Sequence, residues 1–194
     1  MAALLCAATP LRAQGSGPLE VLRGRLDPAT WSAVAAAVDS AQLAGLPAAA
    51  LVSKAQEGVL KRASGAQVIA ATHALLGRLR AAAGALGAGA TPADIEAGAS
   101  ALRVGATPTQ LAALRTARSG RSATVPLVVL TDLLARGVPA EAATRALTLL
   151  GEANATDAAF GTLRAEIERD IQSGVAPASA AMVRSRAAVQ PGRP

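Results

Sequence analysis

Few residues in this sequence could carry nucleophilic or metal chemistry. His73 is the only histidine and Cys6 is the only cysteine. Nucleophilic catalysis needs a nucleophile, a base and an orienting group, and a zinc site needs several histidine or cysteine ligands. His73 lies beside an apolar helical stripe, so we expect a surface or half-buried structural histidine. We therefore predict neither an enzyme nor a protein that holds a metal or other cofactor.

The carboxylates and the clustered glycines form no catalytic pattern either. Glu166, Glu168 and Asp170 alternate along the chain. Side chains two residues apart on a helix point in different directions, so these three do not converge on a metal or a glycosidic bond. Arg164 and Glu168 are four residues apart, which predicts an ion pair on one helix face. The glycine-rich run 84–89 lacks the lysine and the preceding strand of a phosphate-binding loop.

The charge distribution is the feature that could bind a partner. The chain has a formal net charge of +6, and its whole surplus lies in residues 58–131, which hold eight basic and two acidic residues. A basic region attracts anionic partners such as an acidic protein, an envelope polymer or lipid headgroups. The alternative is a set of solvated helix faces with arginines at helix C-termini, where the helix dipole favours cations. The candidate partner-binding residues are Arg78, Arg80, Arg115, Arg118 and Arg121.

The composition indicates that these residues are positioned by helices alone. Hydrophobic residues make up 52% of the chain, yet it has one Trp, one Phe and no Tyr. Much of the apolar content is alanine, the best helix former, and long β-branched runs are missing. A core of Leu, Val, Ile and Ala allows helices to pack closely. The sequence therefore predicts an all-α fold.

Recurring turn signals divide the chain into short helices. Gly89-Ala90-Thr91-Pro92 and Gly105-Ala106-Thr107-Pro108 are 16 residues apart, and Gly137-Val138-Pro139 follows 32 residues later. In each, the glycine can close a helix in the left-handed conformation, and the small apolar residue after it can pack back on that helix. Thr91 and Thr107 can then cap the next helix, with proline at its first position. Another step of 16 predicts a turn at residues 153–156.

These signals predict eight or nine short helices joined by tight Gly/Pro turns. We expect a helical-hairpin array or an irregular bundle with solenoid tendencies. Asp27 and Pro28 should cap and open the first helix. Residues 125–135 are apolar nearly all round, which predicts the most buried helix.

The two ends of the chain have sequence patterns that differ from those of its middle. Residues 1–13 resemble the end of a secretory signal segment, with a short apolar run and Leu-Arg-Ala before Gln14. Residues 14–24 read as a linker, residues 25–188 as the helical domain, and residues 189–194 as a disordered tail. No segment is apolar and long enough for a transmembrane span. We expect an extracytoplasmic, periplasmic or secreted bacterial protein.

Two functions fit these observations. The first is a non-catalytic exported helical protein with an interaction or structural role, which binds an anionic partner through its basic middle region. The alternative is a cytoplasmic helix-turn-helix regulator that binds nucleic acid. In that case Thr107, Thr109 and Gln110 begin the recognition helix, and Arg115, Arg118 and Arg121 contact phosphates. The sequence predicts neither the identity of the partner nor the oligomeric state.

Overall fold

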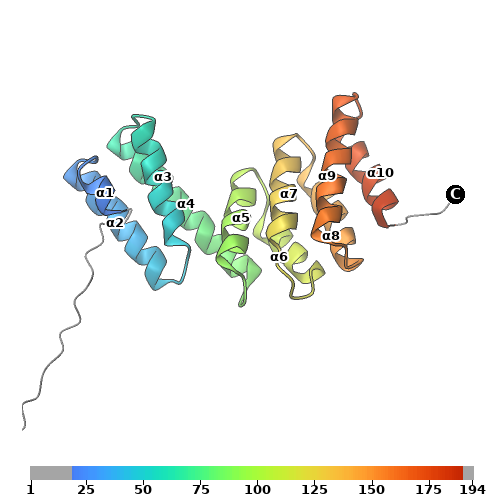
Figure 1. Ribbon diagram of the computed structural model, residues 1–194, viewed down its shortest axis with the longest axis horizontal. Coiled ribbons are helices and arrows are strands. Elements are labelled where there is room, and N and C mark those ends of the chain that lie inside the picture. Colours follow the sequence, from blue (N-terminus) through green and yellow to red (C-terminus); the bar gives the residue numbers. More distant parts are fainter. Residues whose placement is uncertain (1–18, 190–194) are drawn as a thin grey trace, which may run out of the picture.

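The computed structural model describes residues 19–189, and within that range the chain is entirely helical, as predicted (Figure 1). The described part contains ten helices and no strand. They are α1 (Glu20–Arg23), α2 (Pro28–Leu43), α3 (Ala48–Leu60), α4 (Gly65–Leu86), α5 (Pro92–Arg103), α6 (Pro108–Ala117), α7 (Thr124–Ala135), α8 (Ala140–Glu152), α9 (Asp157–Gln172) and α10 (Pro177–Val189).

The count exceeds the predicted eight or nine because of α1, which lies in the predicted linker 14–24. The side chain of Leu22 in α1 is 1% exposed, and α1 contacts α2. Burying a leucine in this way is enough to hold a single helical turn against the larger helix. The predicted signal segment 1–13 and all but the first residue of the predicted tail lie outside the described residues.

The turn signals correspond to real helix ends. Gly105 has a φ of 108° after α5, and the Ala106 N–H donates to the Ala101 carbonyl at 3.0 Å, which is the closing bond of a Schellman turn. Thr91 and Thr107 cap α5 and α6 as predicted, each followed by proline at the first helical position. The predicted turn at 153–156 separates α8 from α9, and Asn154 there takes the left-handed conformation.

The start of α7 departs from the predicted pattern of caps. The residue before it, Ala123, has no side-chain cap. The carboxylate of Asp94 in α5 accepts from the Ala123 N–H at 2.9 Å and from the Thr124 hydroxyl at 2.7 Å. The N-terminus of α7 is therefore capped by a different helix. The helix is also less buried than predicted, because Val128 is 44% exposed.

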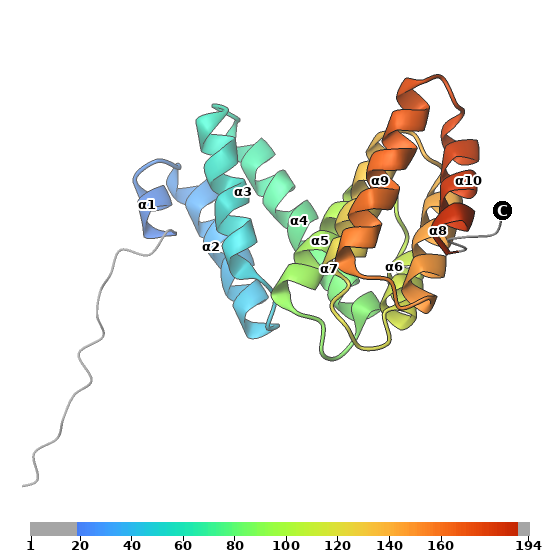
Figure 2. The ribbon, with the colours of Figure 1, turned by 45° about the vertical axis from the view of Figure 1, so that its right-hand side comes forward.

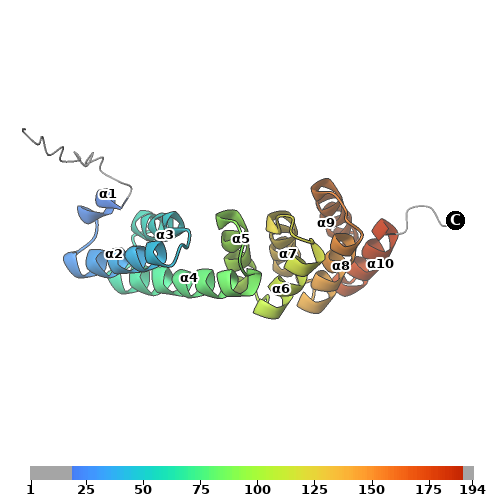
Figure 3. The same ribbon diagram turned by 90° about the horizontal axis from the view of Figure 1, so that it is seen from below.

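Neighbouring helices lie in two rows. In one row α5 contacts α7 and α7 contacts α9, and in the other α4 contacts α6, α6 contacts α8 and α8 contacts α10. Figure 3 shows the two rows one above the other, with α3 continuing the first row and α2 beside α4. The core lies between the rows and is built from leucine, alanine and valine with the single Phe160.

Helix α4 joins the two ends of the molecule. It is 22 residues long and contacts α2 and α3 on one side and α5 and α6 on the other. Figure 2 shows α3 and the C-terminal helices diverging on either side of it.

Candidate partner-binding site

The structure divides the five predicted arginines into two groups. Arg115, Arg118 and Arg121 lie together where the α6–α7 turn meets the α8–α9 turn. The Arg115 guanidinium donates to the Arg121 carbonyl at 2.8 Å, and both Arg118 and Arg121 donate to the Ala155 carbonyl. Their hydrogen bonds hold two turns of the chain together.

Arg118 is unsuited to the predicted role because it is only 3% exposed. Its guanidinium donates to the Ser122 carbonyl at 3.0 Å, to the Ala155 carbonyl at 3.1 Å and to the Asp157 carboxylate at 2.6 Å. It also stacks 5.2 Å from the ring centre of Phe160. The turn geometry directs this side chain into the chain itself, so anion binding by Arg118 stays a prediction that its burial does not support.

Arg78 and Arg80 lie apart from this group on α4. Two residues on a helix are separated by about 200°, so the two side chains leave α4 in different directions. Arg80 donates to the Ser40 hydroxyl of α2 at 2.7 Å. Arg78 is half-buried, and its Nε has no partner within the described part of the chain. The five arginines therefore do not form one surface.

Helices α5 and α6 have the order of a helix-turn-helix, but the residues assigned to DNA contacts already have partners. The Gln110 side chain accepts from the Thr107 N–H at 2.9 Å, which completes a capping box of α6. Arg118 is buried, and α6 packs between α4 and α8. These contacts give the alternative no specific support.

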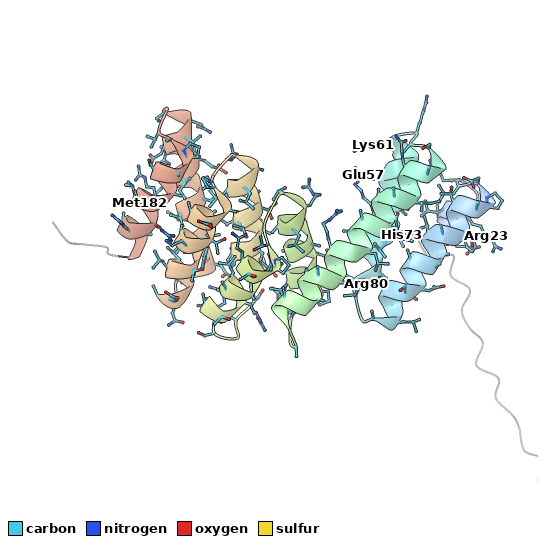
Figure 4. All side chains as sticks on the ribbon, turned by 180° about the vertical axis from the view of Figure 1, so that it is seen from behind. Arg23, Glu57, Lys61, His73, Arg80 and Met182 are labelled. Atoms are coloured by element: carbon cyan, nitrogen blue, oxygen red, sulfur yellow. The ribbon has the colours of Figure 1, made fainter. Side chains whose placement is uncertain are left out.

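A different cluster of cations surrounds a pocket of about 440 Å³ between α3 and α4. Lys54 and Lys61 project from one face of α3, at spacing seven, and Arg62 follows at the turn. The apolar part of its lining, which we call the floor, consists of Gly58, Ala63, Val68 and Ala71, and the polar Gln67 lines the pocket as well. We call this the α3–α4 pocket. Figure 4 shows Glu57 and Lys61 near one end of α4, with Arg80 farther along it.

Close packing of the two helices creates the floor of this pocket. A Cβ atom at Gly58 would lie 2.8 Å from Cγ2 of Val68, so only glycine allows α3 to approach α4 this closely. The Ser64 hydroxyl and the Gln67 side chain form a capping box that starts α4 directly after the turn that holds Arg62.

Glu57 is the only carboxylate that lines the α3–α4 pocket. It accepts from Lys54 Nζ at 2.7 Å and from Lys61 Nζ at 2.5 Å. Hydrogen bonds from Lys54 and then Lys61, with the charges of both, lower the pKa of Glu57 from 4.5 to about 2. Three cations against one carboxylate leave the pocket with a formal charge of +2.

Arg62 occupies an unusual backbone position for an arginine. Its φ is 54°, and the Ala63 N–H donates to the Gly58 carbonyl at 2.9 Å in the same Schellman arrangement as at other helix ends. The left-handed conformation costs a residue with a Cβ atom about 1–2 kcal/mol. In the described part of the chain, the other turns closed by this bond carry glycine or asparagine at that position: Gly45, Gly105, Gly137, Asn154 and Gly174.

Sequence reasoning placed Lys61 and Arg62 in the basic middle region but missed the pocket. A signal was present, because Lys54 and Lys61 are the only two lysines beside 17 arginines. Both lie in this pocket. Lys54 was overlooked because the surplus of positive charge begins only at residue 58.

The remaining candidate residues lie outside any cluster with recognisable chemistry. His73 is exposed on α4 (Figure 4). Among residues 19–189, no group of three or more His, Cys, Asp or Glu side chains could hold a metal ion. Arg164 and Glu168 approach to 4.0 Å as predicted, and Arg136 of α7 contacts the same carboxylate at 2.7 Å. None of the described helices combines the length and apolarity needed to cross a membrane.

Comparison with known proteins gives no relative for this arrangement. No protein-family model, curated protein or solved structure matches the chain significantly.

Proposed function

We propose that this chain is a non-catalytic interaction protein that binds an acidic segment of another protein in the α3–α4 pocket. The observation that carries the proposal is the convergence of Lys54, Lys61 and Arg62 around an apolar floor. The cations would attract carboxylates of the partner, and the floor would receive the methylene or methyl groups of its side chains.

The state of Glu57 supports this function. Its carboxylate bridges the two lysine ammonium groups and so holds them on the pocket side of α3. An incoming carboxylate can share these donors, because each ammonium has three N–H groups. The lysines are therefore positioned before the partner arrives, which reduces the side-chain entropy lost on binding.

The conformation of Arg62 supports it independently. Glycine would satisfy this turn without strain, as it does elsewhere in the chain. Residues in sparsely populated backbone conformations concentrate at functional sites, where another role offsets their cost. For Arg62, that role would be to supply a third cation at the rim of the pocket.

The shape of the pocket favours an acidic protein segment over the other anionic partners. The floor is formed by residues of α3, of α4 and of the turn between them, and the two lysines line the same pocket. A protein segment can place an apolar side chain on the floor and a carboxylate at the rim. A flat layer of lipid headgroups or a uniformly charged polymer would contact only the rim.

The architecture and the location are part of the proposal. We interpret the two rows as an array of helical hairpins with solenoid character, supported by contacts between helices two apart in the chain. Such arrays expose long surfaces suited to protein partners. The signal-like segment 1–13 supports export. N-terminal sequencing of the native protein should find Gln14 as the first residue in an extracytoplasmic fraction, whereas a cytoplasmic chain that retains Met1 would contradict export.

Removal of the pocket cations should weaken binding to an acidic peptide. We expect Lys54→Ala with Lys61→Ala to lower the affinity for a poly-glutamate probe about tenfold or more, because both positioned donors are lost.

Arg62→Gly should also weaken binding, because it removes the third cation. It should raise the free energy of unfolding by about 1 kcal/mol, because it relieves the left-handed strain. Glu57→Gln should strengthen binding, since it removes the competing negative charge while the amide oxygen can still accept from one lysine and so keep it in position. Fluorescence anisotropy at two salt concentrations and urea unfolding measure these effects.

Arg103→Ala with Arg169→Ala is the matched control, because it removes two exposed positive charges, on α5 and α9, outside the pocket. An equal loss of affinity in this control would mean that only the net charge matters and would overturn the site. If polyphosphate or anionic vesicles bind more tightly than poly-glutamate, with the same dependence on the lysines, the partner is an anionic polymer or a lipid surface and not an acidic protein segment. Salt-sensitive binding to duplex DNA unaffected by the lysine variants would favour the helix-turn-helix alternative.

A further inference from the structure

The exposed side of α8 carries alternating charges that have no partner in the described chain. Glu141, Arg145, Thr148 and Glu152 follow each other at steps of four, three and four and so lie on one helix face. The three charged residues are exposed, and within residues 19–189 none of them forms an ion pair. We call this ridge, with Leu149 beside it, the α8 face.

Two grooves flank the α8 face. One, of about 570 Å³, lies toward α6 and includes Gln110 and Thr144, and the other, of about 270 Å³, lies toward α10 and includes Ala142 and Met182. Arg145 and Leu149 line both grooves. Met182 is 49% exposed and shares its groove with the apolar Ala142, Ala146 and Leu149. It lies at the opposite end of the molecule from Lys61 (Figure 4).

Thr144 adds a polar group that the chain leaves unsatisfied. The residue is 8% exposed, and its hydroxyl makes no hydrogen bond. A threonine inside a helix usually donates to the carbonyl four residues earlier, as Thr72 and Thr131 do here. A buried hydroxyl without a partner is destabilising, so a group that enters the groove and bonds to it would gain affinity.

The charges of this surface cancel, in contrast to the rest of the molecule. Glu141 and Glu152 balance Arg145 and Arg186 across the two grooves, whereas the whole chain has a net charge of +6. Two copies of a basic chain repel each other over most of their surfaces. They repel least where a neutral surface faces its own copy.

We propose that the α8 face binds a second copy of this chain in a symmetric dimer. In an antiparallel pair of α8 helices centred between Thr148 and Leu149, Arg145 lies opposite Glu152 of the second copy and Glu152 lies opposite its Arg145. The two-fold axis thus creates two reciprocal ion pairs around a centre formed by Leu149 and Thr148. The ridge of each helix would enter a flanking groove of the other, and Met182 would be covered.

Charge reversal tests the dimer. Arg145→Glu and Glu152→Arg should each raise the dimer dissociation constant about tenfold or more, because each places like charges opposite one another twice. The two changes in one chain should restore the wild-type dissociation constant, since the reciprocal pairs re-form with opposite sign. A mixture of the two single variants should form a heterodimer, because one variant then has two acidic residues at these positions and the other has two basic residues opposite them. Sedimentation equilibrium measures all four cases.

Glu96→Arg on α5 is the matched control, since Glu96 is exposed and lies on a helix outside both grooves. The altered residues are on the surface, so circular dichroism should show an unchanged helix content for every variant. A wild-type chain that remains monomeric at high micromolar concentration would overturn the proposal. A dimer that tolerates both single reversals as well as it tolerates Glu96→Arg would overturn it equally.

Discussion

Replacing Asp94 with alanine should destabilise the chain by about 4 kcal/mol. The Asp94 carboxylate is fully buried and satisfies two turns at once. One oxygen accepts from the Thr91 N–H at 3.0 Å, which caps its own helix α5. The other accepts from the Ser122 hydroxyl, the Ala123 N–H and the Thr124 hydroxyl at 2.8, 2.9 and 2.7 Å, which caps α7. The substitution leaves four donors without their acceptor.

The same residue should make stability depend on pH. Burial alone would raise the pKa of Asp94, but hydrogen bonds from Thr124, Thr91 and Ser122 outweigh it and lower the pKa from 3.8 to about 2. The folded state therefore binds this proton less readily than the unfolded state does. The resulting stability, about 2 kcal/mol, is fully present above pH 3.8 and is lost as the pH falls from 3.8 to 2.

Urea unfolding between pH 7 and pH 2 checks both expectations. Asp94→Asn should lose the part of the acid dependence that belongs to this residue and remain more stable than Asp94→Ala, because it keeps one acceptor. Gln110→Ala is the matched control, since Gln110 occupies the same capping-box position in α6 but reaches no second helix. It should cost about 1 kcal/mol. An alanine variant of Asp94 no less stable than this control would contradict the proposed link between α5 and α7.

Arg118→Ala should lower the free energy of unfolding by about 2–3 kcal/mol. The buried guanidinium joins two turns, because it bonds to Ser122 in the α6–α7 turn and to Ala155 and Asp157 at the α8–α9 turn. Its removal leaves the Ser122 carbonyl and the Asp157 carboxylate without their donor and a void beside Phe160, whereas the Ala155 carbonyl keeps its bond from Arg121. Arg118→Lys should recover only part of the loss, since an ammonium cannot reproduce the planar set of donors.

Chemical denaturation, with Arg121→Ala as the control, distinguishes the stability that comes from the buried contacts of Arg118 from the stability that comes from its positive charge. Arg121 also donates to the Ala155 carbonyl, but it is exposed and its bonds are 3.3–3.4 Å long. Its removal should cost about 0.5 kcal/mol or less. Equal losses for the two arginines would show that Arg118 stabilises the chain only through its charge.

The sequence was most informative about local structure. Glycine, threonine and proline act within a few residues of their own position, so Thr91, Thr107 and Gly105 could be assigned to caps and turns before the fold was known. The cap of α7 could not be assigned from the sequence, because it is Asp94, some thirty residues earlier in the chain. That contact exists only once α5 and α7 are neighbours.

The candidate site was harder to predict for the same reason. A count of charges shows that residues 58–131 are basic but not which side chains face solvent. Arg118 was predicted to bind a partner and instead binds the chain's own turns. Lys54 was missed because its relation to Lys61 depends on the turn of α3 and on the approach that Gly58 allows to α4.

The position of α4 has a consequence for the cooperativity of unfolding. Chains in which each helix contacts only near neighbours tend to unfold from their ends, one pair of helices at a time. Here one continuous helix of 22 residues supports α2 and α3 along one part and α5 and α6 along the other. Unfolding that begins at either end of the chain therefore stops at α4, because helices on both sides stabilise it. We expect α4 to couple the two halves into a single cooperative unit, although most contacts in the chain are local.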